Sequence, residues 1–247
     1  MIQSVSINPG SVELAILCGG RGVRLKPLTD DIPKALVSIQ GRPMLDHIVA
    51  FFAERGFDRY TLCVGYKAEC IRNHFTQSPH RGDFRFSDMG ETASMLKRLW
   101  ALRQTDREHV LIVYGDTFIN LDLEQLFAHH KRSGAQVTIV TAAIRNPFGV
   151  IRFDAEYRVE SFLEKPVSHH YIGCFVMERD AFLRIDETML SLPDGEGLVS
   201  FFHTLIAERT LSAFPHSGLQ ITFNTEIERR RAEKELGEYF TYPERTL

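Results

Sequence analysis

Positive charge gathers around a glycine-rich turn near the start of the chain. In the segment LCGGRGVRLKPLTDDIPKAL, an apolar run leads directly into Gly19, Gly20 and Gly22. Arg24 follows the turn, and Lys34 directly follows Pro33, ten residues after Arg24. Glycines let backbone amides approach an anion closely, and arginine and lysine supply the charge that phosphates require. The spacing is neither GxxxxGK[ST] nor GxGxxG, so it predicts a nucleotide-binding loop of another kind. The alternative is a plain turn with solvated basic residues.

A carboxylate follows the apolar run HVLIVYGD, which is typical of a central parallel strand. Asp116 would lie at the carboxyl end of that strand, where open α/β sheets bind ligands. An oxygen ligand at this place predicts a Mg²⁺ site, with a turn or helix-cap aspartate as the alternative. Asp122 is better explained as the N-cap of the next helix.

The elements that must position these residues alternate along the first half of the chain. VELAIL, RYTLCV, HVLIV and AQVTIVTA predict strands, and residues 43–56, 67–75, 92–104 and 122–134 predict helices. In the second half, FGVIRF, RVESFL and YIGCFVM are closely spaced strands, followed by helices at 197–210 and 225–237. The pattern predicts an α/β fold with a doubly wound, mixed but mostly parallel sheet. We expect one domain over residues 1–247, with a first half at about 12–145 that holds the glycine turn and a second half at about 146–240.

Composition excludes several classes of protein. The 247 residues carry a formal net charge of −3, which disfavours nucleic acid and membrane surfaces as partners. The four cysteines form no CxxC motif, and no apolar run approaches the roughly 20 residues that cross a bilayer. We therefore expect a cytoplasmic protein without disulfides. The ten histidines, including the adjacent pairs His129–His130 and His169–His170, are interpreted as structural or exposed because neighbours in sequence do not share a face.

A longer stretch carries a family resemblance. LCGGRGVRLKPLTDDIPKALVSIQGRPML resembles the signature of the sugar-1-phosphate nucleotidylyltransferases, roughly LAGGxGTRLxPLTxxxPKPLxPIxGKPML. CVGYK, ETASML, YGDTFINLDL, FGVIRFDAEYRVESFLEKP and YIGCFVM are similar to further motifs of the family. GYK, MLKRL and HSGLQITFNT are nearest to the glucose-1-phosphate cytidylyltransferase branch. The resemblance implies a Rossmann-like nucleotidyltransferase (GT-A-like) fold.

The resemblance also implies a reaction and its nucleotide side. A sugar 1-phosphate attacks the α-phosphorus of an NTP, pyrophosphate leaves, and no protein nucleophile is needed. The three glycines would lie against the nucleotide, and Arg24 and Lys34 would hold the triphosphate. Asp116 would bind Mg²⁺, and Glu91 and Thr92 would lie near the base and ribose.

The acceptor side follows from the same resemblance. Glu164 of the EKP motif would accept hydrogen bonds from sugar hydroxyls, and Lys165 would contact the sugar phosphate. Gly149, Tyr171 and Gly173 would lie close to the same ligand. A salt-bridging pair at a strand end is the alternative for Glu164 and Lys165. The resemblance further implies a homo-oligomer.

The chain departs from the family pattern at identifiable places. Val23 replaces a threonine, Glu91 and Ser94 replace glycines, and Phe202 replaces a glutamate. Asn224, or Thr222 in another register, stands where the family has a second metal-binding aspartate. Asparagine can still ligate a metal through its carbonyl oxygen, but without charge.

These departures leave the function open at several points. We expect CTP as the nucleotide and a small phosphorylated acceptor that differs from glucose 1-phosphate. A guanylyl- or thymidylyltransferase and a non-catalytic, nucleotide-binding regulatory subunit are the alternatives. A glycosyltransferase is disfavoured because YGDT holds one aspartate in place of a DxD motif.

Overall fold

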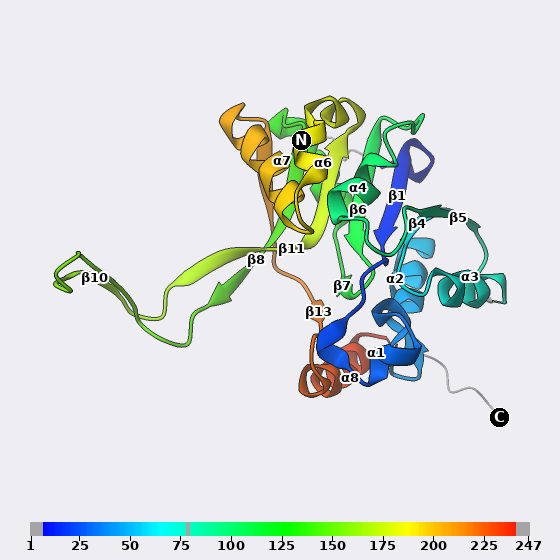
Figure 1. Ribbon diagram of the computed structural model, residues 1–247, viewed down its shortest axis with the longest axis horizontal. Helices are drawn as coiled ribbons and strands as arrows, with labels where there is room; N and C mark the ends of the chain where they lie inside the picture. Colours follow the sequence, from blue (N-terminus) through cyan, green and yellow to red (C-terminus); the bar gives the residue numbers. More distant parts are fainter. Residues whose placement is uncertain (1–6, 78–79, 241–247) are drawn as a thin grey trace.

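The computed structural model describes residues 7–77 and 80–240. Within these residues the largest sheet has seven strands in the order β12-β8-β11-β6-β1-β4-β5 (Figure 1). In sheet order they are β12 (Leu211–His216), β8 (Val137–Arg145), β11 (Val167–Glu178), β6 (His109–Tyr114), β1 (Val12–Leu17), β4 (Arg59–Val64) and β5 (Asp83–Asp88).

The sheet is mixed because of one strand. β11 pairs antiparallel with both β6 and β8, whereas the other neighbours in the sheet pair parallel. The register of β11 against β8 shifts between Tyr171 and Phe175. The predicted doubly wound, mostly parallel α/β fold is therefore confirmed.

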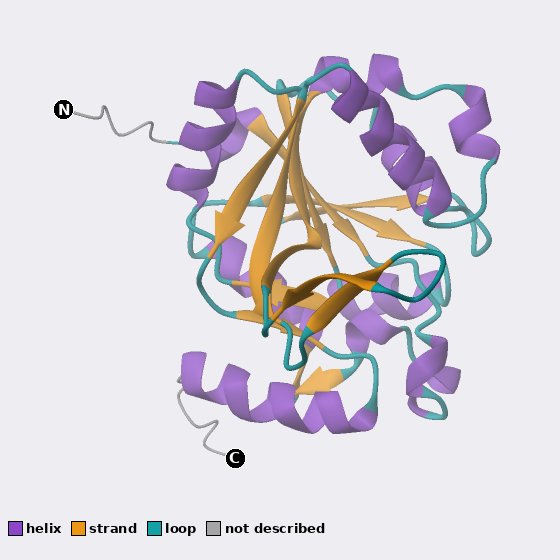
Figure 2. Cartoon of the chain, turned by 90° about the vertical axis from the view of Figure 1, so that its left-hand side faces the viewer, coloured by secondary structure: helices purple, strands orange, loops and turns teal. Residues whose placement is uncertain are grey.

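Alternation along the strands gives the sheet two apolar faces. Leu14 and Ile16 belong to one buried cluster, whereas Ala15 between them belongs to the other. Figure 2 shows helices on both sides of the sheet. One face is covered by α2 (Met44–Ala53), α3 (Ala68–Thr76), α5 (Leu123–Ser133) and α8 (Glu226–Tyr239). The other face is covered by α4 (Met95–Trp100), α6 (Glu187–Ser191) and α7 (Glu196–Ala207).

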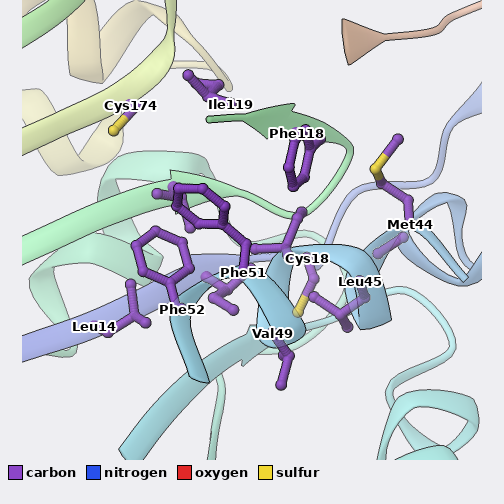
Figure 3. Close-up of a cluster of buried hydrophobic side chains, with 14 of the residues drawn as sticks. Leu14, Cys18, Met44, Leu45, Val49, Phe51, Phe52, Phe118, Ile119 and Cys174 are labelled. Atoms are coloured by element: carbon purple, nitrogen blue, oxygen red, sulfur yellow. The ribbon is translucent and has the colours of Figure 1, made fainter. Parts of the chain in front are cut away.

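Aromatic side chains make the densest part of the first face. Phe51 and Phe52 of α2 meet edge to face, and Phe51 meets Phe118 in the same way at 5.5 Å (Figure 3). Phe118 lies on β7 (Thr117–Ile119), which pairs with β13 (Gln220–Thr222) in a small second sheet. This packing fixes the chain that leaves β6 and brings the segment before α8 beside it.

Helix boundaries follow local capping. Asp122 caps α5 by accepting from the Gln125 amide at 2.9 Å, and Gly134 ends the helix in the left-handed conformation, so the prediction of Asp122 as a cap is confirmed. The helix expected at 92–104 is shorter, because Ser94 caps α4 and the chain returns to turns after Trp100. Short elements complete the chain: β2 (Ser38–Ile39), β3 (Arg42–Pro43), α1 (Leu28–Asp31), η1 (Pro9–Ser11), η2 (Val23–Leu25), η3 (Lys34–Leu36) and η4 (Arg179–Arg184).

A two-stranded arm projects from the body (Figure 1). The outer parts of β8 and β11 continue out of the sheet as a ribbon and lead to β9 (Val150–Phe153) and β10 (Val159–Leu163), which pair with each other. We call residues 144–167 the arm. Its apolar side chains are largely exposed: Ile144, Phe148, Ile151, Phe153, Tyr157, Val159, Phe162, Leu163 and Val167.

Two observations bear on the environment of the chain. All four cysteines are free thiols, three of them buried. Among the residues described, no helix combines the length and apolar character that crossing a membrane requires.

Candidate active site

A pocket of about 540 Å³ opens at the carboxyl ends of β1 and β6. It is the place where a doubly wound sheet binds its ligands. Nine of the residues singled out from the sequence line it: Gly19, Gly20, Gly22, Arg24, Lys34, Glu91, Thr92, Asp116 and Asn224. Residues far apart in the sequence thus meet at one edge of the sheet.

The glycine turn is braced by the neighbouring strand ends. The Gly19 carbonyl accepts from the Tyr66 amide at 3.0 Å, and the Gly22 carbonyl accepts from the Thr29 hydroxyl at 2.9 Å. The Tyr66 hydroxyl in turn donates to the Thr29 carbonyl at 3.0 Å. The loop is therefore held in shape by contacts of its own backbone.

The three glycines have different surroundings. A Cβ on Gly19 would lie 2.6 Å from the guanidinium carbon of Arg98. Gly22 has φ +60 and its Cβ would lie 2.8 Å from the Lys34 Cβ. A Cβ on Gly20 would meet nothing within 4 Å, so this glycine borders open space in the pocket. All three glycines line the pocket, and their contact with a nucleotide stays a prediction.

Two cations and two side-chain oxygens form the centre of the site. Lys34 Nζ donates to Asp116 Oδ2 at 2.5 Å and to Asn224 Oδ1 at 3.0 Å. Arg24 Nη2 donates to the same Asn224 oxygen at 2.8 Å. The Lys34 side chain is only 10% exposed, so Asp116 supplies the opposite charge that its burial demands.

The start of α8 positions Asn224. Thr225 caps the helix by accepting from the Glu228 amide, and Glu228 Oε2 accepts from the Asn224 amide at 2.6 Å. This reciprocal arrangement resembles a capping box displaced by one residue. It fixes the asparagine carbonyl between the two cations. Thr222, the alternative in sequence, instead lies on β13, where its hydroxyl accepts from Thr117 at 3.3 Å.

Arg98 is a residue of the pocket to which sequence reasoning gave no role. It is 5% exposed, lines the pocket, and donates to the carbonyls of Val64 and Gly90. Gly19 and Gly65 both lack the Cβ that would collide with its guanidinium. A signal was present: residues 95, 98, 99 and 102 share one helical stripe, and Arg98 is the charged member of an otherwise apolar face.

A second ion pair stands at the rim of the pocket. Arg21 Nη2 lies 2.8 Å from Glu91 Oε1, and both side chains are about half exposed. The pair joins the glycine turn to the loop before α4. The same loop carries Thr92, which also lines the pocket. Glu91, a departure from the family pattern, thus has a structural partner.

Buried hydroxyl and thiol groups near the pocket stay protonated. Burial raises the pKa of Tyr114 to about 12, and the Asp116 charge acts in the same direction. Burial also raises the pKa of the Cys18 thiol well above its ordinary value. Neither group is suited to act as a nucleophile at neutral pH, which agrees with a direct attack by the substrate.

The residues expected to bind the acceptor divide into two groups. Gly173 has φ +77 and a Cβ there would lie 2.8 Å from the Tyr114 ring, which lines the pocket. The Tyr171 ring also meets Tyr114, with the ring centroids 6.0 Å apart. Glu164 and Lys165 lie instead at the base of the arm, outside the residues that line the pocket, as an exposed ion pair at 3.7 Å.

Gly149 belongs to the arm as well. A Cβ on this glycine would lie 2.7 Å from the Phe162 ring, so Gly149 lets the two strands of the arm approach. Gly149, Glu164 and Lys165 are therefore not brought to the pocket, and their contact with an acceptor stays a prediction.

Comparison with known proteins agrees with this architecture. The family model described as nucleotidyl transferase matches residues 14–198. A probable glucose-1-phosphate cytidylyltransferase of Bacillus subtilis is 26% identical over 238 residues, which cover 87% of this chain and 92% of the relative. A D-glycero-alpha-D-manno-heptose 1-phosphate guanylyltransferase of Aneurinibacillus thermoaerophilus is 31% identical over 159 residues, 62% of this chain and 68% of the relative.

Solved structures show the same fold. The structure of a putative glucose-1-phosphate thymidylyltransferase from Bacillus anthracis superimposes with a TM-score of 0.73 at 17% identity, over 94% of this chain and 98% of that one. The match to the family model spans most of the chain and includes the glycine turn, Lys34 and Asp116. The chain therefore belongs to the nucleotidyl transferase family and is a nucleotidyltransferase, and the family predicted from the sequence is confirmed.

Proposed function

We propose that this enzyme transfers a cytidylyl group from CTP to a sugar 1-phosphate or a similar small phosphorylated acceptor and releases pyrophosphate. The observation that carries the proposal is the convergence of Arg24, Lys34, Asp116 and Asn224 in one pocket beside the glycine turn. Two cations fixed in a partly closed pocket suit a polyanionic triphosphate. The names of the cytidylyltransferase relatives support the choice of CTP.

The residues of the pocket account for the chemistry. An oxygen of the acceptor phosphate forms a bond to the α-phosphorus, and the bond from that phosphorus to the bridging oxygen breaks, so the electron pair leaves with pyrophosphate. Arg24 holds phosphate oxygens with its planar fork, and Lys34 supplies a point charge to them. Catalysis by this set is positioning and charge stabilisation.

The donor set also fits Mg²⁺. Asp116 Oδ2 and Asn224 Oδ1 both contact the same ammonium nitrogen, so they already converge on one cation. Hard oxygen ligands of this kind suit Mg²⁺, with waters and phosphate oxygens completing its shell. When bound, the ion would neutralise charge on the phosphates. Lys34 would then exchange its contact with Asp116 for one with the triphosphate.

The arm suggests a homo-oligomer. Its exposed apolar side chains exceed what an isolated surface strand needs, and a second copy of the chain is the partner implied by the family. In that assembly the arm would bring Glu164 and Lys165 to the acceptor, which would lie beside the nucleotide pocket. Sedimentation equilibrium of the purified protein tests the assembly.

A profile of substrates tests the activity. Pyrophosphate release is measured with CTP, GTP, dTTP, UTP and ATP, each against a panel of sugar 1-phosphates and small phosphorylated alcohols. We expect the highest kcat/KM with CTP and loss of release in Lys34→Ala. A preference for GTP or dTTP would reassign the base and leave the reaction class intact.

The same profile tests the alternative of a regulatory subunit. The neutral Asn224 in place of an aspartate is the observation that favours that alternative. Nucleotide binding by calorimetry without pyrophosphate release from any acceptor of the panel would support a non-catalytic role and overturn the proposal.

A further inference from the structure

A cluster of two histidines and a glutamate lies at the opposite end of the sheet from the pocket. His109 is the first residue of β6 and Glu178 the last of β11, and the two are directly opposed in the antiparallel register. His130 comes from α5, which packs on this part of the sheet. β6 runs from His109 to Tyr114, so roughly 17 Å of strand separates the cluster from the end of the sheet that carries the pocket.

Three ligand atoms converge in this cluster. Glu178 Oε1 lies 3.3 Å from His109 Nε2 and 3.2 Å from His130 Nε2. One ligand atom from each of the three residues lies within 4.8 Å of the others. Among the residues that the structure describes, no other group of three or more histidine, cysteine, aspartate or glutamate side chains is placed to hold a metal ion.

His130 gives the independent indication of a ligand. Its side chain is 1% exposed, and its buried Nε2 makes no regular hydrogen bond but lies 3.2 Å from the Glu178 carboxylate. Its other nitrogen, Nδ1, lies 2.7 Å from the Thr138 hydroxyl. A proton on Nδ1, donated to that hydroxyl, leaves the lone pair of Nε2 directed at the cluster. Orientation of a ligating histidine by a hydrogen bond from its second nitrogen is typical of metal sites.

Two of the three ligand spacings suit a tetrahedral ion. Zinc binds imidazole nitrogen and carboxylate oxygen at about 2.0–2.2 Å, which puts neighbouring ligands of a tetrahedron roughly 3.3–3.5 Å apart. The two distances to Glu178 Oε1, 3.2 and 3.3 Å, are close to this value. His109 and Glu178 are partly exposed, so an ion can enter from solvent and keep a water as its fourth ligand.

We propose that His109, His130 and Glu178 bind one Zn²⁺ or a similar borderline divalent cation. The two imidazoles favour such a cation over Mg²⁺, which prefers oxygen ligands. The site ties α5 to the ends of β6 and β11 and has a structural role. It is separate from the nucleotidyl transfer site, and it does not depend on the substrate proposed above.

Another histidine–carboxylate group of the chain provides a contrast. His74 Nε2 and Asp46 Oδ1 are 2.6 Å apart in a regular hydrogen bond, so that nitrogen already has a partner. His74→Gln therefore serves as a matched control. The exposed pair His169–His170 on β11 controls for adventitious surface binding.

The test uses full-length protein freed of metal with a chelator and then dialysed. Co²⁺ is titrated while the visible absorption of four-coordinate Co²⁺ is recorded, and Zn²⁺ is then added in competition. We expect one equivalent to saturate the signal and Zn²⁺ to abolish it. Thermal unfolding with and without Zn²⁺ gives a second readout, because an ion that binds the folded chain raises Tm.

Substitutions show which residues bind the ion. His109→Gln and Glu178→Gln change partly exposed side chains, and each should weaken Zn²⁺ binding at least tenfold and remove the rise in Tm while the far-UV circular dichroism stays unchanged. His74→Gln, the double variant His169→Gln/His170→Gln and Asp116→Ala should bind as the original chain does. Absence of saturable binding, or binding that survives both His109→Gln and Glu178→Gln, would overturn the site. Loss of Zn²⁺ binding in any control variant would mean that the ion binds elsewhere, and this result would also overturn the proposed site.

Discussion

The pocket and the arm are built in opposite ways. In the pocket, side chains that carry charge are fixed by one another and by backbone carbonyls, as in the contacts of Lys34 with Asp116 and of Arg98 with Gly90. The arm is a two-stranded ribbon whose apolar side chains face solvent. Its Glu164 and Lys165 lie 3.7 Å apart, and its closer ion pairs, from Arg158 to Asp154 and Glu156, belong to the exposed turn between β9 and β10. Figure 1 shows how far the arm stands from the body.

This difference implies that the nucleotide and the acceptor are bound in different ways. The triphosphate side is organised before any ligand arrives, because the sheet edge and the start of α8 hold its cations in place. The arm, by contrast, is held by the pairing of two strands, which has little stability of its own in water. Changes in the pocket should therefore affect chemistry and stability, and changes in the arm should affect acceptor binding and assembly.

The largest effect is expected from Asp116→Ala. The substitution removes the carboxylate that balances a lysine with a 10% exposed side chain, and it removes the oxygen ligand proposed for Mg²⁺. We expect kcat/KM for pyrophosphate release to fall at least roughly 1,000-fold. Asp122→Ala is the matched control, because that aspartate caps α5 and should lower stability by about 1 kcal/mol with activity retained. Near-normal turnover in Asp116→Ala would remove this carboxylate from the chemistry.

The next effect tests how closely the pocket is packed. In Gly19→Ala the new methyl group would lie 2.6 Å from the buried guanidinium of Arg98. We expect the free energy of unfolding to fall by about 1–3 kcal/mol, as in other overpacked sites. Gly20→Ala, which meets nothing within 4 Å, should change it by less than about 0.5 kcal/mol. Denaturant titration compares the two, and equal stabilities would show that Arg98 moves aside without cost.

A smaller, selective effect is expected at the base of the arm. If Glu164 and Lys165 contact the acceptor as proposed, Glu164→Gln and Lys165→Met each remove one charge-assisted contact, and we expect the acceptor KM to rise roughly tenfold. The KM for the nucleotide should stay within about twofold, because neither residue lines the pocket. Arg231→Met, an exposed position on α8, is the control. An equal change in both KM values would mean that the arm also shapes the nucleotide site.

The sequence predicted the parts of this molecule that local rules govern. The apolar periodicity of β1, β6 and α5, the cap at Asp122 and the spacing of the glycine turn to Lys34 are all local, and these elements form as expected. Asn224 could be placed beside Lys34 only through the family pattern, because 190 residues separate them. The burial of Arg98 depends on the close approach of two glycine turns, and the exposure of the arm depends on which strands leave the sheet. Neither feature can be predicted from the residues of one segment alone.

The smallest effect is expected from Asn224→Asp in the pocket, which tests how the charged groups there are held. Asn224 Oδ1 accepts from both Arg24 and Lys34, and a carboxylate there would strengthen both hydrogen bonds and add charge for Mg²⁺. We expect kcat to change by less than about threefold, with half-maximal activity at a lower Mg²⁺ concentration, since the geometry set by Thr225 and Glu228 is kept. Asn224→Ala, which leaves both cations without this acceptor, should lower kcat/KM by roughly tenfold or more. Titration of Mg²⁺ at saturating nucleotide separates these outcomes. A higher Mg²⁺ requirement in Asn224→Asp would mean that the asparagine serves to hold the two cations and not the metal.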